Sequence, residues 1–299
     1  MKEIYLTFDV EDFTDPKVNN KTLQFVVEEL NKLELKGIFF ITAMRAKNID
    51  KKTAMLLKEH EIGYHSSSHS VRPIIFEFTD VEDYETAVEE SLKRETHNVN
   101  IKTWKLSKNK GGIFEVMKIK EDVKSFRAPG YSWSPPHLEA LKELGIEFDF
   151  STKMQNKAFS FKKMTHFPFP VKKNALFYIQ AFMSDPVVVD WHPESFVKKG
   201  WDSIFRFGNP QSIKKANLLD VQSINRNKNT FIGFIRKIRF MLDVGLLKHS
   251  GECKKAIRKI SINEKKVERE YRRASFWPMK YFNYKAKYVE AHFKNYFGV

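Results

Sequence analysis

Polar side chains that can bind a metal ion or transfer a proton occur in five short clusters, and each cluster directly follows a segment rich in apolar residues. The clusters are residues 9–12 (DVED), 65–69 (HSSSH), 127–131 (RAPGY), Asp149 and residues 190–193 (DWHP). Two imidazoles and one carboxylate form a catalytic metal site that keeps positions open for water and substrate. A divalent ion held in this way lowers the pKa of its water toward ~7 and polarises a carbonyl oxygen. These residue types therefore point to hydrolysis assisted by a metal ion.

Each cluster also has a structural explanation when it is taken alone. Acidic residues after a strand commonly cap the next helix, and two histidines four residues apart arise easily by coincidence. Together, however, the five clusters all follow predicted strands, and the carboxyl ends of the strands form the catalytic face of a parallel α/β barrel. We therefore expect the five clusters to converge on one site.

The elements that would position these clusters alternate between strand-like and helix-like segments over the first 200 residues. Strands are predicted at residues 4–8, 38–42, 62–65, 123–127, 146–150 and 186–191, and helices at residues 21–36, 53–59, 80–94 and 136–144. This alternation predicts an α/β architecture with a parallel sheet or barrel. Residues 96–122 are polar and rich in lysine, which indicates an insertion, and residues 158–185 predict a hairpin or additional strands.

The chain has 299 residues and a formal net charge of +15, and this charge is unevenly distributed. Residues 1–200 contain 30 basic and 29 acidic side chains, whereas residues 201–299 contain 22 basic and 8 acidic ones, so the last third carries +14. The boundary predicts a neutral catalytic domain over residues 1–200 and a basic region over residues 201–299. With 42% hydrophobic and 30% charged residues, the chain is not of the disordered class.

The composition also bounds the compartment. One cysteine, Cys253, excludes an intrachain disulfide framework and a cysteine zinc cluster. The first residues (MKEIYLTFD) do not form a signal peptide, because acids interrupt the short apolar run. No stretch of about 18 uncharged apolar residues is present, so we expect no transmembrane helix. The expected location is the reducing cytoplasm.

The five clusters resemble the motifs of the polysaccharide deacetylases, also called NodB-homology or carbohydrate esterase family 4 enzymes. The resemblance covers roughly residues 1–195 and rests on residues 7–12 (TFDVED), 60–69 (HEIGYHSSSH), 126–129 (FRAP), Asp149 and residues 190–193. The first and third motifs are similar to the subgroup that writes Asp-Val-Glu-Asp and Arg-Ala-Pro. The resemblance implies a distorted (β/α)7-type barrel, a metal-dependent hydrolase, and N-acyl amino sugars as the usual substrates.

The resemblance implies a metal ion bound by His65, His69 and one carboxylate. The common family pattern has this carboxylate directly after the catalytic base, but Val10 occupies that position here. Glu11 and Asp12 are both candidates; Asp12 is slightly favoured, because a short side chain needs less ordering. The ligand types suit one divalent ion, with zinc expected and iron, cobalt and manganese as alternatives.

The resemblance also implies the groups that move protons and stabilise charge. Asp9 resembles the base that takes a proton from the attacking water, and Arg127 resembles the residue that pairs with this base and keeps it ionised. Asp149 resembles the acid that orients the arginine. His192 resembles the general acid for the leaving amine, and Gly130 stands where the family provides a backbone N–H for the oxyanion.

Three further histidines and one tyrosine lie close to the motifs. His60 precedes its strand and is expected to be structural, whereas His137, His166 and Tyr131 are candidates for the substrate groove as well as for structural roles.

The basic region is predicted to be mainly helical. Residues 230–247 place apolar side chains at helical spacing with basic ones between them, residues 254–273 form a basic helix, and residues 275–297 are dense in aromatic side chains. An amphipathic helix of this kind packs on its own domain or lies in a lipid interface. Basic and aromatic side chains together also suit nucleic acid, which ranks lower because no nucleic-acid fold motif accompanies them.

The sequence thus predicts a hydrolase that removes an N-acyl group, expected to be N-acetyl, from an amino sugar. The substrate would be a glycan or a lipid-linked or nucleotide-linked saccharide of cell-surface polysaccharide or glycoconjugate biosynthesis. Its partners would be this carbohydrate and an anionic membrane surface, at the cytoplasmic face of the membrane. The alternatives are an amidohydrolase for a formamide or cyclic ureide, and a basic membrane- or nucleic-acid-binding protein without catalysis.

Overall fold

The fold was obtained as a computed structural model of the whole chain, and it is described here for part of the sequence. The described residues are 3–12, 16–68, 81–100, 106–131, 135–151, 157–171, 181, 183–193, 292 and 295. The three segments predicted at residues 230–247, 254–273 and 275–297 therefore lie outside the described residues, apart from His292 and Asn295. No helix within the described ranges is long and apolar enough to cross a membrane.

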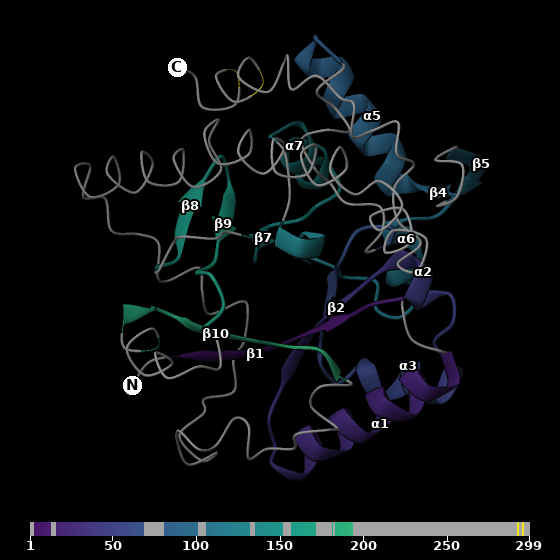
Figure 1. The fold of residues 1–299 in the computed structure, drawn as a ribbon, viewed down its shortest axis with the longest axis vertical. Helices are drawn as coiled ribbons and strands as arrows, with labels where there is room; N and C mark the ends of the chain where they lie inside the picture. Colours follow the sequence, from purple (N-terminus) through teal and green to yellow (C-terminus); the bar gives the residue numbers. More distant parts are fainter. Residues whose placement is uncertain are drawn as a thin grey trace, which may run out of the picture.

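A single curled sheet forms the centre of the described structure (Figure 1). Its strands are β1 (Ile4–Val10), β2 (Gly37–Ile41), β3 (Glu61–Tyr64), β6 (Ser125–Phe126), β7 (Phe148–Asp149), β8 (Phe159–Phe161), β9 (Met164–His166) and β10 (Val187–Trp191). Their order in space is β10-β1-β2-β3-β6-β7-β9-β8, and every neighbouring pair is parallel except β8 with β9.

Two isolated bridges connect the edges of this sheet. Val171, beyond β9, pairs with Val189 of β10, and Lys157, before β8, pairs with Asp185, before β10. The sheet therefore curls back on itself as a distorted barrel, which confirms the predicted α/β fold class. The predicted hairpin within residues 158–185 is also confirmed, since β8 and β9 are antiparallel neighbours.

Helices cover the outer face of the sheet, with α1 beside α3 and α5 beside α7 (Figure 1). They are α1 (Pro16–Lys32), α2 (Ala43–Ala46), α3 (Lys51–Leu57), α5 (Tyr84–Thr96), α6 (Ile113–Met117) and α7 (Pro135–Glu143). The side chains of Asp50 and Asp83 cap α3 and α5 by accepting a backbone N–H of the first turn, each at 2.7 Å. The predicted insertion folds as an antiparallel hairpin, β4 (His97–Val99) and β5 (Leu106–Lys110), followed by α6.

Helix α1 begins at Pro16, five residues earlier than its apolar pattern indicates. Its first turns bury polar side chains, and Asn20 accepts a hydrogen bond from the guanidinium of Arg45 at 2.8 Å and donates one to the carbonyl of Asn48 at 3.1 Å. Because buried amides satisfied in this way stabilise a helix without contributing hydrophobicity, the apolar periodicity missed this part of the helix.

Alternation along the strands divides the core into two layers. The larger layer packs the outer face of the sheet against the helices, and it includes Phe8 of β1 and Val26 of α1. The smaller layer fills the inside of the barrel and consists of Tyr5, Ile38, Phe40, Phe148, Phe150, Phe167 and Val188. Every second residue of β1 from Tyr5 onward therefore faces the interior, because side chains of a strand point alternately to its two faces.

A contact from the C-terminal region reaches the catalytic domain at α5. His292 is buried, and its Nε2 donates to the carbonyl of Val81 at 2.7 Å, while its ring lies 5.7 Å from the ring of Tyr84.

Candidate active site

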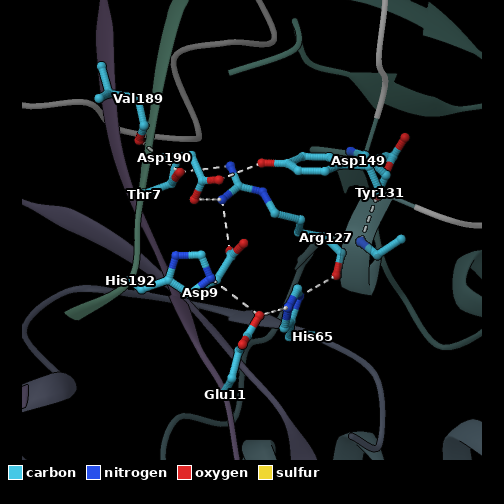
Figure 2. A network of polar contacts seen from close by, with 12 residues as sticks. Thr7, Asp9, Glu11, His65, Arg127, Tyr131, Asp149, Val189, Asp190 and His192 are labelled. Atoms are coloured by element: carbon cyan, nitrogen blue, oxygen red, sulfur yellow. Dashed lines mark hydrogen bonds and ion pairs between the residues drawn. The ribbon is translucent and has the colours of Figure 1, made fainter. Parts of the chain in front are cut away.

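The polar residues that share the interior parity gather at the carboxyl ends of the strands. Asp9 and Glu11 follow Tyr5 along β1 at spacings of two, and Asp190 and His192 follow Val188 along β10 in the same way. His65 directly follows β3. Figure 2 shows Asp9, Glu11, His65 and His192 pointing toward one another around a common space. The structure thus brings together side chains that lie far apart in the sequence.

Arg127, directly after β6, occupies the base of this site. Its Nη1 donates to Asp9 Oδ1 at 2.8 Å and to Asp190 Oδ1 at 3.0 Å, and its Nη2 donates to Thr7 Oγ1 at 2.7 Å. The guanidinium carbon lies 4.5 Å from the centre of the Phe40 ring, so the cation rests on the apolar interior. Burial lowers the pKa of Arg127, but Asp9 and the other acidic groups outweigh it, so the net pKa is raised and the side chain stays charged.

Asp149 does not orient Arg127, which corrects the expectation from the sequence. Its carboxylate accepts from Nδ1 of His166 at 2.7 Å and from the backbone N–H of Ser151 at 3.0 Å. The register pairs Asp149 with Phe126, whose side chain belongs to the outer layer of the core. Because neighbouring residues point to opposite faces of a strand, Arg127 faces the interior and Asp149 does not. Asp190 instead supplies the second carboxylate on the guanidinium.

Asp190 is a functional residue that the sequence reasoning included in a cluster without assigning it a role. Its Oδ2 accepts from the hydroxyl of Tyr131 at 2.6 Å. Burial and the nearby Asp9 raise the pKa of Asp190 to about 6, against the opposing effect of Arg127. The signal that could have found it is its spacing of two from His192, which places both side chains on the same face of the strand.

His65 is buried and oriented at both ring nitrogens. Its Nδ1 donates to the backbone carbonyl of Arg127 at 2.7 Å, which leaves the lone pair on Nε2. Nε2 lies 3.8 Å from Oε1 of Glu11. Burial lowers the pKa of His65, and the carboxylates of Asp9 and Glu11 raise it by more.

The donor set at His65 fits a divalent metal ion. A histidine that ligates a metal commonly donates its other ring N–H to a carbonyl or carboxylate, as Nδ1 of His65 does. Two ligands that are each about 2.1 Å from a tetrahedral ion are about 3.4 Å apart, close to the separation of His65 Nε2 and Glu11 Oε1 of 3.8 Å. Within the described ranges no group of three or more potential ligands is found, and His69 lies outside those ranges.

The two candidate carboxylates face different partners. Glu11 Oε1 lies near the imidazoles of His65 and His192, at 3.8 and 3.4 Å from their Nε2 atoms. Asp12 Oδ2 accepts from the hydroxyl of Ser68 at 2.8 Å. Glu11 has the interior parity of Asp9, and this alternation is the sequence signal that separates it from Asp12.

His192 is the most open of the charged groups in the site, with 46% of its side chain exposed. Its contact with Glu11 is the largest of the effects that raise the pKa of His192 to about 9. The ring is therefore protonated near neutral pH and can donate a proton to a group in the opening. Gly130 lies in the short 3-10 turn Pro129–Tyr131, next to this opening through the hydroxyl of Tyr131.

The remaining histidines are structural. His60 accepts from the N–H of Gly37 at 3.3 Å, and burial lowers its pKa to about 4, as expected for a structural residue. His137 and His166 were groove candidates, but both are fully buried and bonded to the carboxylates of Glu95 and Asp149.

Comparison with known proteins gives one family and several structural likenesses. Residues 1–148 match the model of the polysaccharide deacetylase family. No curated protein matches the chain. A putative polysaccharide deacetylase from Mycobacterium smegmatis is 13% identical, over 75% of this chain and 90% of that one, with a TM-score of 0.47.

Two further solved structures are similar at the same level. A family 4 acetyl xylan esterase from Clostridium thermocellum, in complex with a cobalt ion, is 16% identical over 75% of this chain and 91% of that one, with a TM-score of 0.41. A CE4 family pseudoenzyme from Bacillus anthracis is 15% identical over 73% of this chain, with a TM-score of 0.43. The chain spans 64% of that pseudoenzyme, which is less than two thirds of its length.

Proposed function

Because the chain belongs to the polysaccharide deacetylase family, whose members are hydrolases, we propose that it removes an N-acetyl group from an amino sugar with the help of one divalent metal ion. The observation that supports this proposal is the convergence of Asp9, Glu11, His65, Arg127 and His192 at the carboxyl ends of four strands. Such a constellation supplies a base, a metal ligand set and an acid within one opening.

His65, Glu11 and, by resemblance, His69 would hold the metal ion. Zinc is proposed, and iron, cobalt and manganese suit the same donors. The ion, when bound, supplies an activated water and polarises the acyl oxygen. Asp12 then serves a separate role, because its carboxylate accepts from Ser68, the residue directly before His69.

The chain's own residues supply the proton transfers. Asp9 takes a proton from the attacking water, and Arg127 holds its carboxylate in place through the 2.8 Å hydrogen bond. His192 is protonated near neutral pH, so its imidazolium gives a proton to the leaving amine of the sugar. Gly130, by resemblance, provides the backbone N–H for the developing oxyanion.

Acetate release from N-acetylglucosamine oligosaccharides tests the reaction directly. We expect release by the metal-loaded chain, loss on treatment with a chelator, and no activity in His65→Ala. His97→Ala is the matched control, because His97 lies on β4 outside the site and bonds to the carbonyl of Lys93. Equal release by wild type and His65→Ala would refute the assignment.

The basic region over residues 201–299 would bring the neutral domain, residues 1–200, to an anionic surface. The net charge of +14 in this region supports a lipid-linked or nucleotide-linked substrate at the cytoplasmic face of a membrane. Each basic residue near such a surface contributes about 1 kcal/mol, and salt screens the attraction. The full chain should therefore sediment with vesicles rich in phosphatidylserine at low salt and not with phosphatidylcholine vesicles. Binding to neither vesicle, or stronger salt-dependent binding to an oligonucleotide, would contradict this role.

A further inference from the structure

The three serines that separate His65 from His69 each donate a hydrogen bond to a different anchor. Ser66 Oγ donates to Glu95 Oε1 at 2.9 Å, Ser67 Oγ donates to the carbonyl of Arg94 at 3.2 Å, and Ser68 Oγ donates to Asp12. The first two anchors belong to the last turn of α5. Helix α5 therefore contacts the segment that carries His65, although it contributes no residue to the catalytic constellation.

The backbone of this segment needs such support. Ser66 has a φ of +61°, a conformation that side-chain-bearing residues adopt rarely. Strained conformations of this kind persist only where the surroundings determine them fully. The carbonyls of Ser66 and Ser67 accept from the N–H groups of Ala43 and Met44 at 3.0 and 2.9 Å, which fixes one side of the segment.

Glu95 fixes the other side. Only 3% of its surface is exposed, and its carboxylate accepts from three groups: the hydroxyl of Tyr64, the hydroxyl of Ser66, and Nε2 of His137 at 2.7 Å. Tyr64 and Ser66 are the two neighbours of His65 in the chain. Burial, reinforced by Glu95, raises the pKa of Tyr64 well above its ordinary value, so its hydroxyl remains a donor.

The backbone of Glu95 is itself held by the hairpin that follows α5. The N–H of Gly111 donates to the carbonyl of Thr96 at 2.9 Å, so the turn after β5 packs on the end of the helix. A Cβ added to Gly112 would lie 2.0 Å from the carbonyl oxygen of Glu95. The close approach at a glycine leaves α5 little freedom to shift, and the Glu95 carboxylate is positioned by backbone as well as by its three donors.

We propose that Glu95 is a positioning residue for the metal site, which fixes the backbone on both sides of His65 so that its Nε2 faces Glu11. This inference rests on the proposed function, in which His65 is a metal ligand. Glu95 lies one residue beyond the groups that bond to His65 itself, and it acts through Tyr64 and Ser66. Residues that orient a ligand in this way commonly contribute 10–100-fold to metal affinity.

The test measures metal binding by the full chain, independently of activity. Glu95→Gln keeps the volume but replaces one acceptor oxygen with an NH2 group, so it cannot accept from all three donors. We expect its zinc dissociation constant, measured by competition with a chromophoric chelator, to rise at least about 10-fold. The visible spectrum of the cobalt-loaded protein should change with it, since this spectrum reports ligand geometry.

Two further variants separate positioning from folding. Ser66→Ala removes one donor and leaves Glu95 in place; it should also weaken zinc binding, and the effects of the two substitutions should be less than additive, because both act on one contact. Ser91→Ala is the matched control, because Ser91 is buried one turn earlier on α5 and donates only to the carbonyl of Ala87. It should leave the zinc affinity unchanged.

The outcomes distinguish the inference from the function on which it rests. A lower melting temperature of Glu95→Gln with unchanged zinc affinity would mean a merely structural role and would overturn the inference alone. If Glu95→Gln does not fold, unchanged zinc affinity of Ser66→Ala overturns the inference in the same way. A wild-type chain that binds no zinc or cobalt would overturn the proposed function and the inference with it.

Discussion

Replacing Arg127 with methionine would leave two carboxylates facing each other in a buried site. Both Asp9 Oδ1 and Asp190 Oδ1 accept from the same nitrogen, at 2.8 and 3.0 Å. Their oxygens are therefore at most about 6 Å apart, where two negative charges repel by at least about 3 kcal/mol at an effective dielectric constant of about 20. Removal of one partner from a buried ion pair costs about 3–5 kcal/mol in total. We expect Arg127→Met to lower the free energy of unfolding by this amount at pH 8.

The loss should depend on pH, because Asp190 can accept a proton. Its pKa is already raised to about 6 by burial and Asp9, and Arg127 is the group that lowers it, so the pKa rises further in the variant. A carboxyl group whose pKa is higher in the folded than in the unfolded state adds stability below its unfolded pKa. That stability is lost as the pH rises through the folded pKa. The difference between Arg127→Met and wild type should therefore shrink by about 2 kcal/mol between pH 8 and pH 5.

Urea denaturation at both pH values measures this difference. Arg127→Lys is the control that keeps the charge, and its loss should vary less with pH. The double variant Arg127→Met/Asp190→Asn should recover about 2–3 kcal/mol at pH 8, since it removes one of the repelling charges. An equal loss at pH 5 and pH 8, together with no recovery in the double variant, would refute the electrostatic reasoning.

Gly112→Ala and Gly145→Ala both place a side chain at a positive φ, but only Gly112 faces the carbonyl of Glu95, whereas nothing lies within 4 Å of the Gly145 position. Gly145→Ala should cost about 1–2 kcal/mol of unfolding free energy and Gly112→Ala at least about 2 kcal/mol more; equal losses in urea denaturation would show that the clash is relieved. Asp83→Ala should lower the unfolding free energy by about 1 kcal/mol through loss of the α5 cap, and an unchanged midpoint would contradict this cap energy. His192→Gln should lower kcat for acetate release about 100- to 10,000-fold with little change in KM; a change confined to KM would argue against its role as the acid.

The sequence predicted those parts of the fold whose signal is local. Strands β1, β2, β3 and β10 are continuous apolar runs, and such runs are typical of parallel sheets. The hairpin of β4 and β5 was not predicted as strands, because the residues of β5 (LSKNK) are mostly exposed and lack any apolar alternation. Its position depends on contacts with the end of α5, such as the approach of Gly111 to Thr96, which no local pattern encodes.

The candidate site shows the same division. The five clusters were found because strand ends converge in this fold, and that convergence follows from topology alone. The wrong partner was assigned to Arg127, because Asp149 also follows a strand but faces the other side of the sheet. The role of Glu95 was not predicted, because it lies on a helix outside the motifs and acts only through hydroxyl groups of the His65 segment.

The pairing of β1 with β10 also determines when the site can form during synthesis. Thr7 and Val189 are hydrogen-bonded neighbours although 182 positions separate them in the chain. The base on β1 and the acid after β10 therefore cannot meet until nearly two thirds of the chain has been made. Pairings this distant in sequence make folding slow, and until then β1 exposes an open edge that can pair with other chains. About a hundred residues follow β10, which at roughly 5–20 residues per second gives the sheet about 5–20 s to close before synthesis of this chain ends.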